Sequence, residues 1–367
     1  MTQSATDTSA PEVVFDHLRA MTDGRGLFEH SLGALPRRES GYCTDDVARA
    51  LVVVCRDPDP GLQELGAHYL AFTLAAVTAD GRCHNRMNID GVWTDEPSLG
   101  DWWGRAAWGL GSAAAHAHTP QMRADALTGF RRVTQQRSLF RRSMAFAGIG
   151  AAEVLLKRPR DPQPRALLAE VARTVGKPEL AQPGLGEPAV RAAALVPHPR
   201  RGAPAEPVWP WPEARLTYGN ATITEALLLA GTILPDTRAA KQGLELLDFL
   251  LAIQTHKGHL SPVPAGGRGP QDDIPGFDQQ PIEVAALADA CSRAFEVTKD
   301  EKWRTAVRLA WAWFLGHNDS STAMVDLTTG SGYDGLQLVG RNDNRGAEST
   351  LAMLSTAQQA RRLGVLL

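Results

Sequence analysis

The sequence has few cysteines, no strong excess of either charge and no long apolar run, and each absence excludes a class of protein. The four cysteines form neither CxxC pairs nor the dense spacing of a disulfide scaffold, which favours reduced thiols. Lys plus Arg number 38 against 41 Asp plus Glu, so the net charge of −3 argues against a nucleic-acid partner. No apolar run could span a bilayer, and the opening MTQSATDTSAPE lacks signal-peptide features. We therefore expect a cytoplasmic protein without membrane insertion.

Apolar residues recur at helical spacing along most of the 367 residues, whereas strand-like alternation is rare. The pattern is typical of an all-α fold of about a dozen helices joined by turns. We predict helices at 10–21, 44–56, 60–79, 102–118, 121–137, 141–157, 163–175, 186–196, 219–231, 236–254, 279–297, 299–316 and 346–363.

Small residues and charged faces divide these helices into two kinds. Segments 44–56, 102–118, 219–231, 279–297 and 346–363 are rich in Ala, Gly, Ser and Thr, which let neighbouring helices approach closely, and we expect them to be buried. Segments 236–254 and 299–316 carry a charged face, as outer helices do. Alternation of the two kinds predicts two concentric rings.

Two regions break the helical pattern. Residues 80–101 form a long loop or a small hairpin, and the stretch 158–212 holds half of the chain's 24 prolines. The second stretch is either a linker between two domains or a loosened pair of outer helices within one domain. We favour the latter, because the same kind of helix resumes after it. The expected organisation is a disordered tail at 1–10 and a single domain at 11–367 with a Pro-rich irregular region.

Each helix of the buried set follows a loop that combines acids or amides with aromatic residues or glycine. These loops are 41–46, 93–96 with 101–105, 209–213 with 218–220, 277–283 and 342–348. If all five helices belong to one inner ring, their N-terminal ends emerge together and the loops converge on one mouth. Taken singly, each acid also fits a helix cap or a first turn, where carboxylates favour the helix dipole.

A sugar explains this mixture of residues, because its C–H faces stack on aromatic rings and its hydroxyls pair with carboxylates, amides and Arg. Nine Trp against four Tyr, most of the Trp beside acids in loops, fit such a ligand. The predicted substrate-binding residues are Tyr42, Arg86, Trp93, Asp101, Trp102, Arg105, Trp209, Trp211, Tyr218, Asn220, Gln279, Gln280, Glu283, Asn344 and Glu348.

Inverting cleavage of a glycosidic bond needs an acid and a base carboxyl roughly 6.5–9.5 Å apart, which facing helices of a ring can provide. We predict Glu213 as the acid, because the Trp and Pro residues around it could shield it from water. Asp46 or Asp45 is the preferred partner, and Asp278 follows.

Other chemistries lack their motifs. The sequence contains no HExxH and no Cys/His set of zinc spacing, and we expect His116-x-His118 and His256-x-x-His259 to bind no metal. No Walker loop, dinucleotide fingerprint or GxSxG elbow occurs, so no cofactor is predicted. The arginine pairs, Arg141-Arg142 among them, are offset by acids and are predicted to lie on solvated faces.

The strings GYCTDDVARAL, DWWGRAAWGLG, WPWPEARLTYGNA, FDQQPIEVAALADA and RGAESTLAML, in this order between about residues 12 and 364, carry a family resemblance. The chain resembles an uncharacterised bacterial family of six-hairpin (α/α)6 barrels that are often fused to, or encoded beside, glycosyltransferases. Its wider relatives are the six-hairpin glycosidases and the N-acylglucosamine 2-epimerase-like proteins. The resemblance implies an (α/α)6 barrel with a carbohydrate-facing cavity, and it leaves a glycosyltransferase partner open.

The leading hypothesis from the sequence is an inverting glycoside hydrolase that acts on an oligosaccharide or glycan. A second hypothesis is a non-catalytic glycan-binding or scaffold partner of a glycosyltransferase. A glycoside phosphorylase and a sugar epimerase are further alternatives, and His84 and Tyr42 are the obvious residues for an epimerase.

Overall fold

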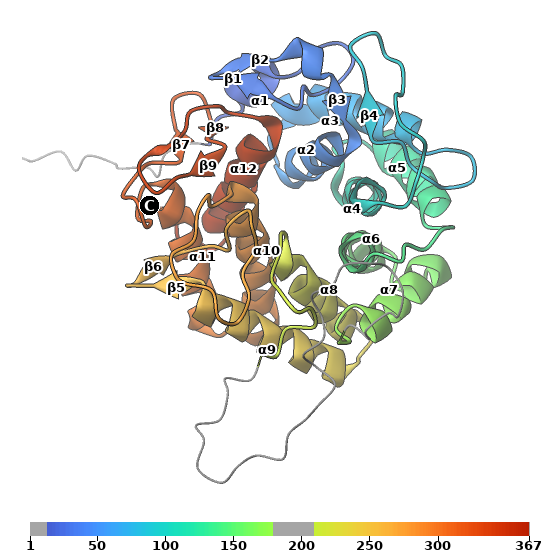
Figure 1. The fold of residues 1–367 in the computed structure, drawn as a ribbon. Coiled ribbons are helices and arrows are strands. Elements are labelled where there is room, and N and C mark those ends of the chain that lie inside the picture. The colour runs from blue at the N-terminus through green and yellow to red at the C-terminus, as the bar shows by residue number, and fades with distance from the viewer. Residues whose placement is uncertain (1–12, 179–208, 367) are drawn as a thin grey trace, which may run out of the picture.

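The computed structural model describes residues 13–178 and 209–366, in which helices alternate between an inner and an outer ring (Figure 1). The inner helices are α2 (Thr44–Arg56), α4 (Asp101–His116), α6 (Arg141–Lys157), α8 (Asn220–Ile233), α10 (Pro281–Thr298) and α12 (Ala347–Arg362). The outer helices are α1 (Asp16–Ala20), α3 (Gln63–Ala76), α5 (Pro120–Val133), α7 (Pro162–Thr174), α9 (Thr237–Ile253) and α11 (Glu301–Phe314). Each inner helix packs on the next, and α12 closes the ring against α2.

The helical periodicity located most of these helices within a few residues. The prediction for 10–21 was too long, because α1 covers five residues, and the predicted helix 186–196 lies outside the described residues. The buried set was incomplete: α6 is a sixth inner helix, and its residues from Arg142 to Leu155 are all buried. None of the helices in the described parts of the chain is long and apolar enough to cross a membrane.

Glycines allow the inner helices α4 and α6 to meet backbone to backbone. A Cβ atom placed on Gly111 would lie 2.3 Å from the carbonyl oxygen of Gly150, and one on Gly104 would lie equally close to the carbonyl oxygen of Ser143. No side chain fits at such a distance. The small residues of the inner helices therefore set the spacing of the ring.

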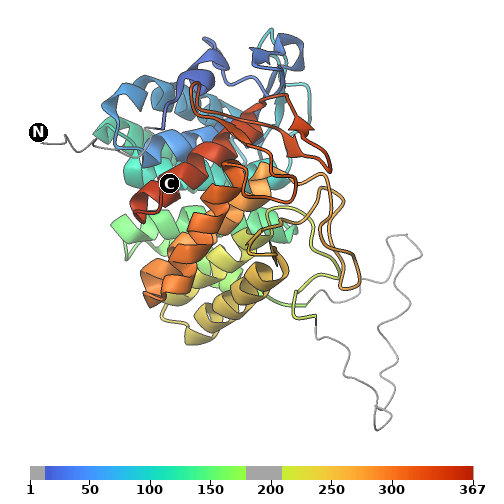
Figure 2. The same ribbon diagram turned by 90° about the vertical axis from the view of Figure 1, so that its left-hand side faces the viewer.

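Loops and short strands gather at one end of the ring, on the right in Figure 2. Within residues 13–178 and 209–366 the strands form five antiparallel pairs, namely β1 (Ser31–Leu32) with β2 (Leu35–Pro36), β3 (Tyr42–Cys43) with β4 (Arg86–Met87), β5 (Thr255–His256) with β6 (His259–Leu260), β7 (Val325–Asp326) with β8 (Ser331–Gly332), and β9 (Gly335–Leu336) with β10 (Arg341–Asn342). Since β4 pairs with the strand that leads into α2, the loop 80–101 brings Arg86 to the start of that helix.

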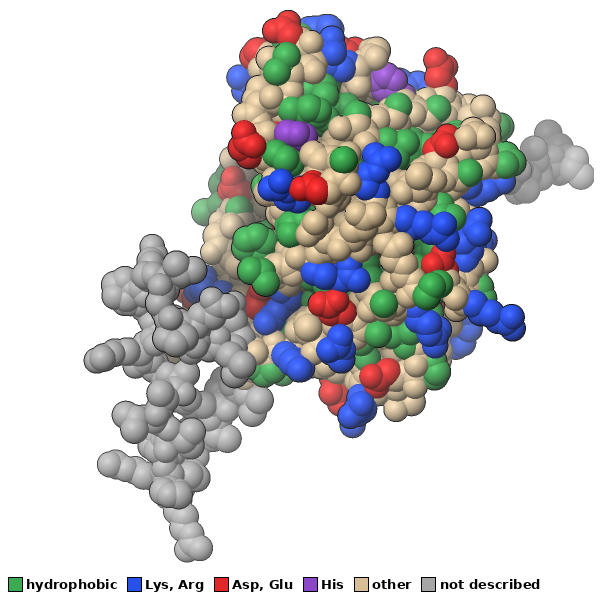
Figure 3. All heavy atoms as spheres, turned by 90° about the vertical axis from the view of Figure 1, so that its right-hand side faces the viewer, with side chains coloured by type: hydrophobic (Ala, Val, Ile, Leu, Met, Phe, Trp, Pro, Cys, Tyr) green, Lys and Arg blue, Asp and Glu red, His purple; other side chains and the backbone are tan. Residues whose placement is uncertain are grey.

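Most of the tryptophan surplus serves packing. Trp103, Trp303, Trp311 and Trp313 are among the largest fully buried side chains, and three of them belong to the outer helix α11, which they anchor. Acidic and basic side chains are interspersed on the face that Figure 3 shows, in keeping with the near-zero net charge.

Candidate functional site

A cavity of about 390 Å³ lies where the inner helices begin, and we call it the mouth cavity. Four of the five predicted loops contribute to its wall, together with the first turns of α2, α4 and α12. Its lining residues are Glu29, His30, Cys43, Asp45, Asp46, Arg49, Asn85, Arg86, Asp101, Trp102, Gln280, Asp334, Gly346, Glu348 and Ser349.

Arg49 lines the mouth cavity and contacts three carboxylates. Its Nη2 atom lies 2.6 Å from Oδ1 of Asp46 and 3.1 Å from Oδ2 of Asp45, while Nη1 lies 2.7 Å from Oε2 of Glu348. The spacing i, i+3 and i+4 on α2 places both aspartates beside the arginine. A second cation, Arg105 of α4, lies 2.9 Å from Oδ1 of Asp45. Carboxylates from both ends of the chain are thus bound by one guanidinium.

Two carboxyl groups of the mouth cavity have pKa values that shift in opposite directions. Burial raises the pKa of Asp46 to about 7, because Arg49 offsets only part of the desolvation. Burial also disfavours the charged form of Glu348, but Arg49 and Arg105 outweigh it, so the pKa of Glu348 lies below its ordinary value. Near neutral pH, Asp46 can hold a proton while Glu348 stays ionised.

Cys43 links Asp46 to the loop before α2. Its sulfur accepts a hydrogen bond from the backbone N–H of Asp46 and donates one to Oδ2 of the same residue, both at 3.4 Å. Burial, together with Asp46, raises the pKa of Cys43 well above its ordinary value, so the group stays a neutral thiol. Arg86 closes this side of the cavity through its ion pair with Glu29.

A second charged network surrounds Glu213, the residue predicted as the acid. Both of its oxygens are bound by Arg142 of α6, at 2.7 and 2.8 Å, and the Trp211 indole donates to one of them at 3.1 Å. Glu213 does not line the mouth cavity. The prediction that Arg142 lies on a solvated face was wrong, because the residue is 8% exposed. Its buried charge is paired with the carboxylate of Glu213.

The network continues from Arg142 to Glu283. Arg142 donates to Oδ1 of Asn220 at 3.1 Å, and Nδ2 of Asn220 donates to Oε2 of Glu283 at 2.8 Å. The backbone N–H of Gly219 also donates to Glu283. Burial raises the pKa of Glu283 to about 7 despite these donors. Asn220 and Glu283 are therefore buried partners of each other in this structure.

Asp101 joins three elements at the wall of the mouth cavity. One of its oxygens accepts a hydrogen bond from the Ser143 hydroxyl at 2.8 Å, and the other accepts one from the Tyr218 hydroxyl. Arg142 lies over the Tyr218 ring, 5.0 Å from its centroid. Tyr218 is 43% exposed, so its ring forms a partly open rim.

Of the aromatic residues predicted to stack on a sugar, Trp102 lines the mouth cavity. Its indole N–H donates to the Cys83 carbonyl at 2.8 Å, which fixes the ring. The others contact protein: Tyr42 is buried against Phe28 and Phe72, Trp93 stacks on His84, Trp209 donates to the carbonyl of Glu213, and Trp211 is buried.

Of the predicted residues in the last two loops, some line the mouth cavity and others lie outside it. Gln280 lines the mouth cavity, whereas the neighbouring Gln279 is fully buried and donates to Asp319 at 2.7 Å. Asn344 accepts a hydrogen bond from the backbone of Gly33, so its amide oxygen braces a loop. Asp278 is exposed and does not line the mouth cavity.

Sequence reasoning did not select Arg49, Arg142, Glu29 or His30. The signal for Arg49 was its spacing of three and four residues after Asp46 and Asp45, which predicts ion pairs on one helical face. Arg142 begins a segment as rich in small residues as the five predicted inner helices. Nothing in the sequence indicates that Glu29 and His30, before any inner helix, reach the mouth cavity.

No family model and no curated protein matches the chain. Among solved structures, a sugar epimerase from a ruminal bacterium is similar with a TM-score of 0.63 and 13% identity, covering 95% of both chains. A D-mannose isomerase matches with a TM-score of 0.66 and 12% identity over 95% of this chain and 94% of its own. An inactive α-1,6-mannanase of Salegentibacter sp. HEL1_6, in complex with α-1,6-mannotetrose, matches with a TM-score of 0.61 and 11% identity over 95% and 96%.

These likenesses confirm the predicted fold class: the chain folds as a six-hairpin (α/α)6 barrel. At such low identity they show the fold and not the reaction.

Proposed function

We propose that this protein is a carbohydrate-processing enzyme and, more narrowly, a glycoside hydrolase whose catalytic carboxyl groups are Asp46 and Glu348. The observation that carries the proposal is the opposite shift of their pKa values within one cavity. Such a pair supplies an acid and an ionised partner at the same pH, which glycosidic cleavage requires.

Their shared contact with Arg49 limits the separation of the two groups. Both contact the same guanidinium, Asp46 at 2.6 Å and Glu348 at 2.7 Å, so their contacting oxygens are at most roughly 8 Å apart. Carboxyl groups of glycosidases are about 5–5.5 Å apart in retaining enzymes and about 6.5–9.5 Å apart in inverting ones. Glu213 does not line the mouth cavity and is left out of the acid role in this proposal.

In the proposed inverting reaction, Asp46 donates its proton to the glycosidic oxygen as the bond to the anomeric carbon breaks. Glu348 takes a proton from the water that attacks this carbon from the opposite face. Trp102 offers a ring for stacking, and Arg86 and Gln280 offer donors for hydroxyls. A volume of about 390 Å³ lies within the range of small-molecule sites.

The solved structures agree with this class without fixing the reaction. The similar mannanase is an inactive variant in which two consecutive aspartates are replaced by alanine. Asp45 and Asp46 are likewise consecutive and begin an inner helix. We therefore include an oligomannoside among the first substrates to test.

A sugar epimerase or isomerase is the second candidate, and a specific residue favours it. The His30 imidazole lines the mouth cavity with 56% of its side chain exposed, so it could exchange a proton with a bound sugar. The similar sugar epimerase and D-mannose isomerase add weight to this alternative. Of the residues the sequence suggested, His84 stacks on Trp93 and Tyr42 donates to Asp23.

One set of measurements separates the candidates. The protein is incubated with a panel of oligosaccharides and free sugars, and new reducing ends and deuterium uptake from D₂O at C2 are measured. A hydrolase produces reducing ends without deuterium at C2, and an epimerase does the reverse. Saturable binding without either product supports instead the glycan-binding partner of a glycosyltransferase.

Variants then test the two residues. Asp46→Asn and Glu348→Gln should each lower kcat by about 10²–10⁴-fold, as expected when a proton-transfer group is lost. Asp90→Asn, which removes an exposed carboxylate from the loop 80–101, should leave kcat unchanged. Full activity of Asp46→Asn would exclude it as the acid.

A further inference from the structure

The hairpin β5–β6 places two imidazoles side by side, away from the mouth cavity. Lys257 and Gly258 form its two-residue turn with φ values of 49° and 85°, as a type I′ turn requires. This turn sets His256 directly opposite His259 in the register. Residues in such a pair project from the same face of a hairpin, and the two ring centroids are 6.0 Å apart.

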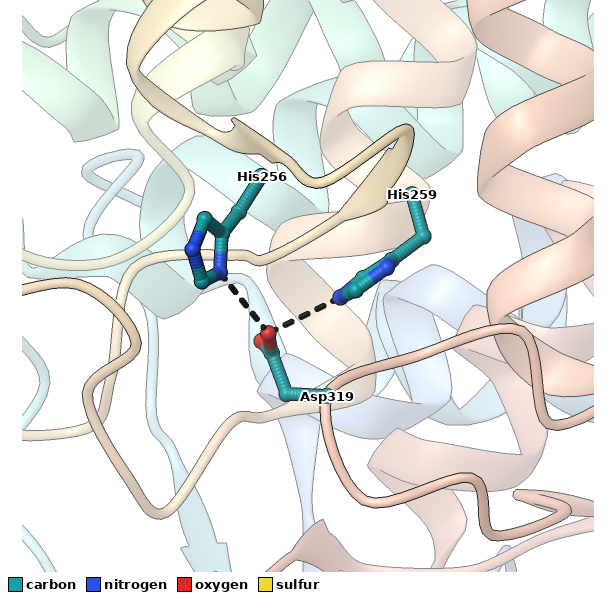
Figure 4. Close-up of side chains that lie close together, drawn as sticks. All are labelled: His256, His259 and Asp319. Atoms are coloured by element: carbon teal, nitrogen blue, oxygen red, sulfur yellow. Dashed lines mark hydrogen bonds and ion pairs between the residues drawn. The ribbon is translucent and has the colours of Figure 1, made fainter.

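Asp319 completes a cluster with the two histidines (Figure 4). Its Oδ1 atom lies 3.3 Å from Nδ1 of His256 and 2.9 Å from Nε2 of His259. The loop that carries Asp319 follows α11 and is held by Asn318, whose Nδ2 donates to the carbonyls of Trp313 and Thr322 at 2.9 and 2.7 Å. The carboxylate is therefore held in place from a different part of the chain.

Against the expectation from the sequence that His256 and His259 bind no metal, we propose that they form, with Asp319, a binding site for a divalent transition-metal ion, with Zn²⁺ as the best match. Two imidazoles and one carboxylate are a ligand set that zinc accepts, with its fourth position left to water or another donor. The three donor atoms all lie within 4.8 Å of one another. Zinc–nitrogen distances of about 2.0–2.1 Å place tetrahedral ligands roughly 3.3 Å apart, close to the two separations found here.

The surroundings of the cluster match those of a metal site. Asp319 is nearly buried, and its second oxygen, Oδ2, accepts a hydrogen bond from Nε2 of Gln279 at 2.7 Å. An outer partner of this kind orients a metal-bound carboxylate. His256 and His259 are 24% and 22% exposed, so an ion can enter from solvent.

Bound metal would join the hairpin to the loop after α11 and, through Gln279, to the segment that enters α10. Gln279 directly precedes Gln280, which lines the mouth cavity. The expected role is therefore structural: the ion braces one wall of the mouth cavity from outside it. The inference does not depend on the proposed reaction, since a purely binding protein would gain the same brace.

The test is a titration of the full chain with metal. The protein is treated with a chelator, dialysed and titrated with Zn²⁺ by calorimetry, and Co²⁺ is added in parallel to record visible d–d absorption. We expect one Zn²⁺ per chain, the absorption pattern of tetrahedral Co²⁺ and a higher Tm with metal. Absence of saturable binding would show that the cluster is held by hydrogen bonds alone and would overturn the proposal.

Variants assign the ligands. His256→Gln and His259→Gln should each weaken binding by at least about 100-fold, more than loss of an outer partner does. His317→Gln is the matched control, because this exposed histidine lies on the same loop as Asp319 but outside the cluster. Equal losses in all three variants would refute the assignment. Circular dichroism of the metal-free variants checks that each one folds.

Discussion

Replacing Asp46 by Asn should stabilise the folded protein at alkaline pH while it removes the proposed acid. The side chain is 4% exposed, and its burial raises the pKa from 3.8 to about 7. Between these two pH values the folded protein holds a proton that the unfolded chain has lost. The free energy of unfolding therefore falls as the pH rises through this range.

The size of the effect follows from the width of the pH window. From pH 5 to pH 7 the folded protein keeps about one more proton on Asp46 than the unfolded chain does. Two pH units at about 1.4 kcal/mol each give about 3 kcal/mol. An Asn side chain has no charge to bury at any pH, and Arg49 retains Asp45 and Glu348 as partners. The stability of Asp46→Asn relative to the natural protein should thus rise by about 3 kcal/mol between pH 5 and pH 8.

Urea unfolding followed by circular dichroism at pH 5, 6, 7 and 8 measures this difference. Asp45→Asn is the matched control, because it removes the adjacent carboxylate, which faces both Arg49 and Arg105. Loss of that partner should destabilise the protein at pH 8 by about 1–3 kcal/mol. A constant or shrinking advantage of Asp46→Asn with rising pH would refute the reasoning, since the ion pair with Arg49 would then outweigh desolvation.

Three further predictions concern packing and thiols. Gly111→Ala should lower stability by about 1–3 kcal/mol, because its Cβ would meet the backbone of Gly150, whereas Gly24→Ala, with open space around it, should be neutral in thermal unfolding. Gly41→Ala should lower the thermal stability more than Gly340→Ala does. Both positions have a positive φ, but only at Gly41 would a Cβ atom meet a carbonyl oxygen, that of Met87, at 2.3 Å. The four buried cysteines should resist a thiol reagent in the folded protein and all react in denaturant; rapid native labelling would contradict their burial.

The ring could be predicted from the sequence because its cause is local. Helical spacing of apolar residues gives the helices, and small residues mark those that pack on both sides. The same reasoning missed α6 as an inner helix, since the arginine pair at its start is typical of a solvated face. In the ring, Arg142 is buried because Glu213, 71 residues away, supplies both of its carboxylate contacts. A partner so distant in the sequence cannot be inferred from the residues of the helix itself.

The convergence of the polar loops was also predictable, and four of the five contribute residues to the mouth cavity. The functions of individual residues were not. Trp and Pro surround Glu213 in the sequence, yet Arg142 binds both of its oxygens. Gln279 and Gln280 are neighbours in one loop, and the turn into α10 directs one into the protein and the other to the cavity. Side-chain direction at a helix start depends on the turn, which residue type alone does not determine.

Burial and ion pairing together link the structure to the proposed chemistry. Three carboxylates that line the mouth cavity, Asp45, Asp46 and Glu348, form ion pairs with Arg49, and Asp45 also pairs with Arg105. Asp46 is the most buried of the three, and its desolvation, together with Glu348 and Asp45 nearby, raises its pKa to about 7 although Arg49 favours the charged form. Asp46 therefore holds a proton near neutral pH, as the proposed reaction requires of its acid. Since Glu348 comes from the opposite end of the chain, this arrangement exists only once the ring has closed.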